Sequence, residues 1–254
     1  MKKLLLVGII GLPTLGMSQF TEKLSLQLEY GQQVNQQTHI NGTILDTSLF
    51  SLGTQNDPRT EGFEQVDAFS VRFNVRPSRL WDMGIVGRWQ QESLQHQAYT
   101  PYQDEDFDLL FFRVATHRME FTQLGANGHF FVNQLFNDNS AFEYGAEAEL
   151  NFTRTEYEYY QNNYELNSGT HFIGQVTQYR GFANSCAGRL GIHASYGFIF
   201  RQSRLAIGLN GGYQFGFSQK LSNSGGESFV DITDQQAEVA LNGAYASVFL
   251  KFSR

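Results

Sequence analysis

The chain has 254 residues, a formal net charge of -7 and a single cysteine, Cys186. The acidic balance argues against a nucleic-acid-binding protein, which needs a basic surface, and one cysteine cannot form an internal disulfide. Aromatic residues make up 15% of the chain, with 25 Gly and only 4 Pro, a composition typical of strand-rich proteins and not of disordered ones.

The N-terminus has the layout of a secretory signal peptide. Lys2 and Lys3 are followed by an apolar run over residues 4–12 and by the small residues Gly16 and Ser18. The run is too short to span a bilayer as a helix, and no cysteine follows it to carry a lipoprotein anchor. We expect cleavage after Ser18, so that residues 1–18 are the signal peptide and residues 19–254 are one exported domain.

Eight later segments alternate between apolar and polar or small residues with a period of two, the pattern of half-buried strands. In chain order they are 23–31, 69–76, 81–90, 119–132, 142–153, 189–200, 205–217 and a last segment that ends at Phe252. The fourth segment changes phase around Gln123, which predicts a β-bulge there. The phase of the last segment is ambiguous, because Tyr245 and Phe249 have the opposite parity to Val248 and Phe252.

The connections between these segments alternate strictly in length. Those at 77–79, 137–140 and 201–204 are short and turn-like, whereas those at about 36–62, 93–118, 162–184 and 221–236 are long and polar. An even-stranded outer-membrane barrel has short periplasmic turns and longer extracellular loops. The predicted fold class is therefore all-β, a closed antiparallel up-and-down transmembrane β-barrel of about eight strands, with both termini in the periplasm.

Two segments leave the strand count open. Residues 109–114 are apolar without alternation and could form an extra strand, a short helix or a plug inside a loop. If they and residues 171–179 both crossed the membrane, the barrel would have ten strands.

The distribution of charge favours a membrane barrel over a soluble lipocalin-like barrel or sandwich, which needs apolar residues inside. The bulky apolar residues would face lipid, and the opposite parity carries charges that would face the lumen. This predicted lumen set comprises Glu29, Arg72, Asp82, Arg88, Glu143, Glu147, Glu149, Arg189 and His193. Buried charges must be paired or hydrated, so we expect a structural ion-pair network that fills the barrel, with a conductive path as the alternative.

With these features the chain resembles the small eight-stranded outer-membrane barrels, the family of OmpA-like transmembrane domains and opacity-type surface proteins. The resemblance rests on the signal peptide, the strand count, the loop alternation and the aromatic-rich last strand over residues 244–252, although Ser253 and Arg254 follow the final Phe252. It implies a location in the Gram-negative outer membrane, contact with its lipids and lipopolysaccharide, and insertion by the barrel assembly machinery. Family members include anchors, adhesins, small channels and a few enzymes, so the resemblance does not fix an activity.

No candidate for catalysis or metal binding is complete. His193 and Ser195 resemble the His-x-Ser pair of an outer-membrane lipid A deacylase, but Tyr196 replaces the expected Asn, no matching Glu follows, and both residues would face the lumen. Asp104, Asp106 and Asp108 could bind a hard cation, yet they lack the Gly and distal Glu of a calcium loop, so a solvated acidic run is expected. The histidines His39, His96, His117, His129 and His171 have no spacing that suggests a metal site. We predict no enzyme, cofactor or metal.

Two remaining features concern the surface. Tyr157, Tyr159, Tyr160 and Tyr164 are expected to form part of an aromatic girdle, with a sticky surface for a host or glycan partner as the alternative. Cys186 is expected to be a small residue that faces lipid or a loop. The predicted function is a non-enzymatic structural or surface-interaction role through four long extracellular loops, whose ligand is not evident, and the alternative is a small porin-like channel.

Overall fold

The computed structural model describes residues 24–35, 65–104, 107–136, 140–165, 171–200, 203–217, 219–228, 236–239 and 241–254. Eight antiparallel strands close into a barrel in the order β1-β10-β7-β6-β5-β4-β3-β2. They are β1 (Leu24–Asn35), β2 (Gln65–Val75), β3 (Trp81–Asp104), β4 (Phe107–Phe136), β5 (Ser140–Glu165), β6 (His171–Phe200), β7 (Ser203–Gly216) and β10 (Gly243–Ser253). A separate short pair is formed by β8 (Gln219–Lys220) and β9 (Glu238–Val239).

The structure confirms the predicted all-β class and the count of eight strands in the closed barrel. Residues 109–114 and 171–179 belong to β4 and β6, so the ten-stranded alternative is wrong. The chain therefore has the fold of the small eight-stranded barrels that it resembles in sequence. Among the described residues, no helix is long and apolar enough to cross a bilayer.

The register fixes the width of the barrel. Paired residues followed once around the barrel from Phe130 on β4 lead back to β4 at Glu120, a shear of ten residues. Eight strands with this shear tilt by about 40° from the barrel axis. A barrel of this size leaves an interior that side chains alone can fill.

Polarity is inverted relative to a soluble protein. Along β5, Glu143 and Glu147 have buried side chains, while Leu150 and Phe152 on the opposite parity are 67% and 55% exposed. The same contrast holds around the barrel, where exposed large apolar residues include Leu24, Phe73, Ile85, Leu124, Ile192, Phe198, Leu205, Ile207 and Leu250. The predicted assignment of apolar residues to the outer face is therefore confirmed.

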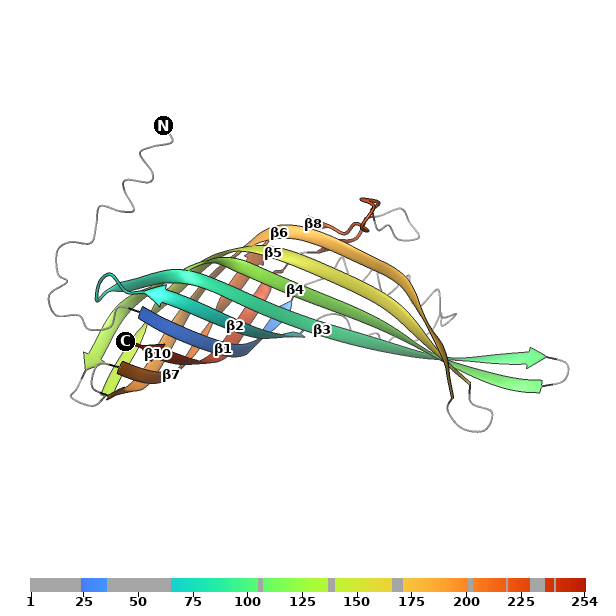
Figure 1. Cartoon of the computed structure of the whole chain (residues 1–254), viewed down its shortest axis with the longest axis horizontal. Coiled ribbons are helices and arrows are strands. Elements are labelled where there is room, and N and C mark those ends of the chain that lie inside the picture. Colours follow the sequence, from blue (N-terminus) through green and yellow to red (C-terminus); the bar gives the residue numbers. More distant parts are fainter. Residues whose placement is uncertain are drawn as a thin grey trace, which may run out of the picture.

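Four strands continue well beyond the rest of the barrel. β3 and β4 remain paired out to Asp104 and Phe107, and β5 and β6 remain paired out to Glu165 and His171. Figure 1 shows this extension of β3–β6 projecting from one end of the barrel, with the C-terminus near the other end. The prediction that 93–118 and 162–184 are loops is wrong. The sequence of these extended segments lacks the period-two alternation that reveals the other strands.

The other two long connections are only partly described. Residues 36–62 lie outside the described residues. The connection predicted at 221–236 lies between the short strands β8 and β9, and Leu221 within it donates a backbone hydrogen bond to the carbonyl of Ala237.

The predicted bulge at Gln123 is wrong. Met119, Phe121 and Gln123 all have buried side chains on the same parity of β4, so the strand keeps its phase there. The phase appeared to change in sequence because the first two residues are apolar yet face inward. The register between β4 and β5 shifts instead between Phe131 and Asn133.

The inward apolar residues of the extension form a small core of their own. Met119, Phe121, Tyr157, Tyr159 and Ala183 from β4, β5 and β6 pack with Leu221, Ala237, Val239 and Leu241 from the connection that precedes β10. Hydrogen bonds in both directions between the backbones of Phe182 and Ser222 fasten this connection to β6. We call the nine packed residues, Met119, Phe121, Tyr157, Tyr159, Ala183, Leu221, Ala237, Val239 and Leu241, the apolar cap.

Candidate functional site

The barrel interior contains all nine residues of the predicted lumen set. The side chains of Glu29, Arg72, Asp82, Arg88, Glu143, Glu147, Glu149, Arg189 and His193 are all buried, none with more than 6% of its surface exposed. They come from five strands, β1, β2, β3, β5 and β6, and reach the interior because each lies on the inward parity of its strand.

Arg72 on β2 is the centre of this arrangement. Its side chain is fully buried and its guanidinium contacts three carboxylates, with Nη2 at 2.7 Å from Glu29 Oε2 and 2.6 Å from Glu149 Oε1, and Nη1 at 2.8 Å from Glu147 Oε2. A guanidinium presents five donors in a fixed plane, so one Arg can hold carboxylates from different strands. Arg72 thus joins β1 and β5 across the interior.

Arg88 and Arg189 complete the ion pairs around these carboxylates. Arg88 Nη1 lies 2.9 Å from Glu149 Oε2, and Arg189 Nη1 lies 3.8 Å from both Glu29 and Glu149. The Arg189 guanidinium carbon is 3.4 Å from the centre of the Tyr245 ring, and the Tyr245 hydroxyl donates a 2.5 Å hydrogen bond to Glu147. The network is therefore held by stacking as well as by charge.

A second group of charges lies around Glu143 and Asp82. Glu143 pairs with Arg76 at 2.8 Å and also with Arg204. Asp82 pairs with Lys251 Nζ at 3.0 Å and with His129 Nδ1 at 2.6 Å. Each carboxylate accordingly has at least two partners, as the burial of a charge requires.

Five members of the network were not in the predicted set: Arg76, Arg204, Lys251, His129 and Tyr245. Arg204 lies in the segment predicted as a turn, and Lys251 and Tyr245 lie in the strand whose phase is ambiguous. Strand parity could have identified Arg76 as an interior residue, because Arg76 has the same parity as Arg72. In the described part of the interior, six buried basic side chains lie among five buried acidic ones, so the charges nearly balance. The basic residues are Arg72, Arg76, Arg88, Arg189, Arg204 and Lys251, and the acidic residues are Glu29, Asp82, Glu143, Glu147 and Glu149.

The pair His193 and Ser195 is buried, but its geometry is not that of a catalytic pair. The His193 ring packs 5.0 Å from the His129 ring and 5.2 Å from the Phe131 ring, between centroids. Neither His193 nitrogen has a hydrogen-bond partner among the described residues, so no carboxylate orients the ring. Ser195 Oγ accepts a 3.4 Å hydrogen bond from Arg204.

The acidic run of Asp104, Asp106 and Asp108 lies where β3 ends and β4 begins. Asp104 is the last residue of β3, Asp108 is the second residue of β4, and Asp106 lies outside the described residues. His39 and the signal peptide at 1–18 also lie outside them. In the part of the chain that is described, no group of three or more His, Cys, Asp or Glu side chains could hold a metal ion.

The predicted aromatic girdle is wrong for two of its tyrosines. Tyr157 and Tyr159 are buried members of the apolar cap, and Tyr157 forms a 2.8 Å hydrogen bond with His117 Nδ1. They face inward because they have the same parity on β5 as the buried Thr153 and Thr155. Tyr160 and Tyr164 are half-buried, and Cys186 is exposed.

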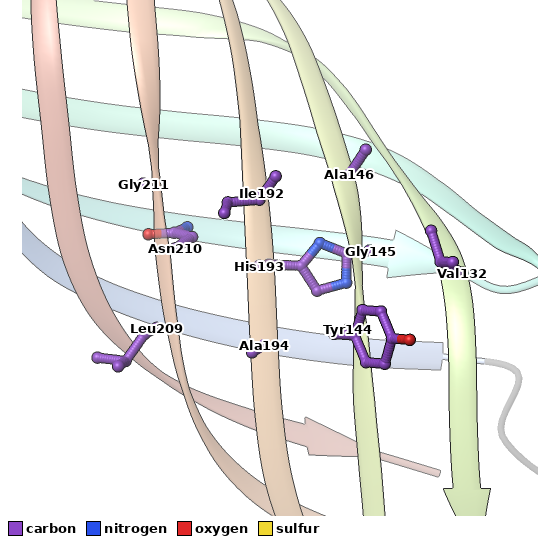
Figure 2. Close-up of a pocket in the computed structure, with 10 residues that line it drawn as sticks. All are labelled: Val132, Tyr144, Gly145, Ala146, Ile192, His193, Ala194, Leu209, Asn210 and Gly211. Carbon is purple, nitrogen blue, oxygen red and sulfur yellow. The ribbon is translucent and has the colours of Figure 1, made fainter.

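The outer wall of the barrel has a shallow apolar groove with a volume of about 500 Å³. Figure 2 shows its lining, which comes from β4, β5, β6 and β7: Val132, Tyr144, Gly145, Ala146, Ile192, His193, Ala194, Leu209, Asn210 and Gly211. The groove exists because Ala146, Ala194 and Gly211 are small, whereas Tyr144 and Leu209 beside them project outward. Its surface is almost wholly apolar.

Comparison with solved structures finds matches of low sequence identity. No protein-family model matches the chain, and no curated protein matches it. Two crystal structures of Ail, the attachment invasion locus protein of Yersinia pestis, match over 91% of this chain and 97% of theirs. The first has 8% identity and a TM-score of 0.31. The second, in complex with the heparin analogue sucrose octasulfate, has 9% identity and a TM-score of 0.33. The outer membrane protease OmpT from Escherichia coli matches with 9% identity over 91% of this chain and 94% of its own, with a TM-score of 0.20.

Proposed function

We propose that this chain is a non-enzymatic barrel of the Gram-negative outer membrane, with a closed, structural interior and an extension that acts as a binding surface outside the cell. The observation that carries the proposal is the fully buried Arg72, paired with three carboxylates from β1 and β5. An interior filled in this way supports a scaffold better than a channel, because ions would have to displace charges that already neutralise one another.

The outer face supports the membrane placement and the direction of insertion. On the outer face of β5, the exposed apolar residues Leu150 and Phe152 are followed by the charged residue Arg154, which pairs with Glu156 at 2.9 Å. The apolar belt therefore ends where the extension begins. The short connection between β2 and β3 and the C-terminus lie at the other end, which is periplasmic in barrels of this kind. Outer-membrane lipids and lipopolysaccharide would then surround the belt.

The apolar cap supports a closed interior from the outer side. Leu221 and Ala237 are fully buried against Met119 and Phe121, on the side of the network that would face the extracellular medium. A dry apolar layer over a polar interior adds a barrier to ion movement, because a charge loses its hydration on entering it.

One observation favours the alternative, a small channel. The side-chain amides of Asn127 and Gln214 are buried in the interior and have no hydrogen-bond partner within the described part of the chain. Buried polar groups of this kind bind water, and a connected file of water could carry ions.

Conductance in a planar bilayer separates the two functions. The purified protein should be electrically silent, and Arg72→Gln should produce conductance steps because it leaves three carboxylates without their shared partner. The matched control is Arg154→Gln, which removes an Arg from an exposed pair on the outer face and should stay silent. Stable steps from the unaltered protein would favour the channel and contradict the scaffold.

A further inference from the structure

The outer face of β4, β5 and β6 has a charged hollow just beyond the apolar belt. Its volume is about 160 Å³, and it is lined by Arg118, Glu120, Glu156, Glu158 and Arg180. Arg118 and Arg180 lie on either side of Glu158, each directly paired with it across the strands, and Glu120 is directly paired with Glu156. Three carboxylates against two guanidinium groups give the lining an excess of negative charge.

The carboxylates of the hollow are incompletely neutralised. Glu120 and Glu156 occupy opposite positions on β4 and β5, where like charges destabilise a sheet. Each has an arginine beside it, Arg118 at 3.1 Å from Glu120 and Arg154 at 2.9 Å from Glu156. Within the described part of the chain no ion pair reaches Glu158. The hollow therefore favours the entry of one more positive group.

Two arginines beside the hollow have donors that can bind an anion. Arg154 and Arg180 each contact one oxygen of Glu156, at 2.9 Å and 3.4 Å, and each guanidinium carbon lies 5.5 Å from the centre of the Phe182 ring. Their side chains are 57% and 59% exposed. Because a guanidinium has five donors, each arginine has donors left for a second acceptor, and phosphate is an acceptor that arginine binds well.

The height of the hollow corresponds to the headgroup layer of a bilayer. On the outer face of β5, the apolar or small residues from Phe142 to Phe152 cover ten residue steps. With strands tilted by about 40°, these steps rise by about 25 Å along the barrel axis, which is the height of the apolar band of a membrane barrel. Arg154 is the next outward residue, and Glu156 and Glu158 follow it.

We propose that the charged hollow binds the headgroup of a phosphoethanolamine lipid, with the phosphate on Arg154 and Arg180 and the ammonium against Glu158. The proposal rests on the membrane placement proposed above. In this headgroup the phosphate lies next to the acyl chains and the ammonium lies two carbons further out. The protein has the same order, because Arg154 follows the apolar belt and Glu158 lies beyond it.

A primary ammonium suits the hollow better than other cationic headgroups. It has three N–H donors, so it can contact Glu158 and also reduce the repulsion between Glu120 and Glu156. The quaternary ammonium of phosphatidylcholine has no N–H donor, and phosphatidylglycerol has a phosphate but no cation. Comparison of these three lipids therefore separates the contribution of the ammonium from that of the phosphate.

Lipid competition tests the proposal. The mature protein is reconstituted in vesicles that contain equal amounts of phosphatidylethanolamine, phosphatidylcholine and phosphatidylglycerol with identical acyl chains. Native mass spectrometry then measures which lipids remain bound after release into detergent. We expect phosphatidylethanolamine to be enriched about two- to fivefold over the other two, which is the size of effect that one exposed ion pair provides.

Charge variants test the two halves of the site separately. Glu158→Gln should abolish the preference for phosphatidylethanolamine, and Glu158→Lys should reverse it in favour of phosphatidylglycerol, a reversal that misfolding would not produce. Arg180→Gln should lower the retention of all three lipids. The matched controls are Asp67→Asn and Arg254→Gln, which remove exposed charges of the same signs elsewhere and should keep the preference.

Equal retention of the three lipids by the unaltered protein would overturn the proposal, as would a preference that persists in Glu158→Gln. Enrichment of phosphatidylglycerol by the unaltered protein would show a site for anions alone and would also overturn it. The membrane placement is checked in the same vesicles with Leu150→Cys in a Cys186→Ser background. If lipid shields this cysteine from an impermeant maleimide and no preference is found, only the lipid site is wrong. A labelled cysteine would contradict the placement and the site together.

Discussion

At the scale of single residues, Arg72 has the largest predicted effect on stability. Arg72→Met should destabilise the barrel by about 3–5 kcal/mol, because it leaves Glu29, Glu147 and Glu149 buried without their shared partner. Arg154→Met, which removes an exposed pair with Glu156, should cost less than about 1 kcal/mol. Urea titration in detergent micelles, followed by tryptophan fluorescence, measures both, and equal midpoints would contradict the central place of Arg72.

Gly191 makes room for the Tyr245 side chain. A Cβ at this position would lie 2.1 Å from the Tyr245 hydroxyl and 2.7 Å from the carbonyl oxygen of Gly211, closer than atoms can approach. Gly191→Ala should therefore lower the unfolding midpoint, with Tyr245→Phe restoring part of the loss. Gly87→Ala is the matched control, since no atom lies within 4 Å of its Cβ. A Gly191→Ala protein as stable as this control would show that the strands can separate to accept the methyl group.

Residue parity determined how much of the interior could be predicted. Glu147 and Glu149 lie in a strand with six regular alternations, so their inward direction followed from the sequence. Lys251 and Tyr245 lie in a strand where Phe249 faces inward among polar neighbours, so hydrophobicity leaves the direction of its side chains ambiguous. The pairing of Arg72 with particular carboxylates depends on the register, which alternation alone does not define.

At the scale of elements, the apolar cap is predicted to fold as a unit on the inner side of β4–β6. Leu221→Asp should place a charge among Met119, Phe121 and Val239 and release the connection before β10. Lys220→Asp changes an exposed neighbour and should leave it in place. Limited proteolysis checks this, and we expect faster cleavage between β8 and β9 only for the first variant. Unchanged cleavage would mean that backbone hydrogen bonds alone hold the connection.

The extension shows where strand prediction from hydrophobicity fails. Residues 93–104 and 107–118 are paired strands, yet they contain no alternation and read as a loop. Alternation arises where the two faces of a strand lie in different environments, and the sequence of these segments shows no such difference. The short turns at 77–79 and 201–204 were recognisable because Pro, Ser and Arg interrupt two alternating segments.

At the scale of the whole molecule, the proposed membrane boundary crosses β5 between Phe152 and Glu156. In a Cys186→Ser background, a membrane-impermeant maleimide should label Glu156→Cys in intact cells and leave Leu150→Cys unlabelled, although both residues lie on the outer face of one strand. Labelling after solubilisation in urea controls for reactivity. Equal labelling in cells would contradict the boundary or the proposed orientation.

The seam between β1 and β10 has a consequence for biogenesis. Ser247 donates a hydrogen bond to Glu29, a residue 218 positions earlier, and Arg72 reaches Glu147 across 75 positions, so the network is completed only when the last strand meets the first. Before that moment an open sheet in hydrocarbon would expose its charges and its backbone edges to lipid. On the proposed membrane placement, insertion and closure must therefore occur as one event.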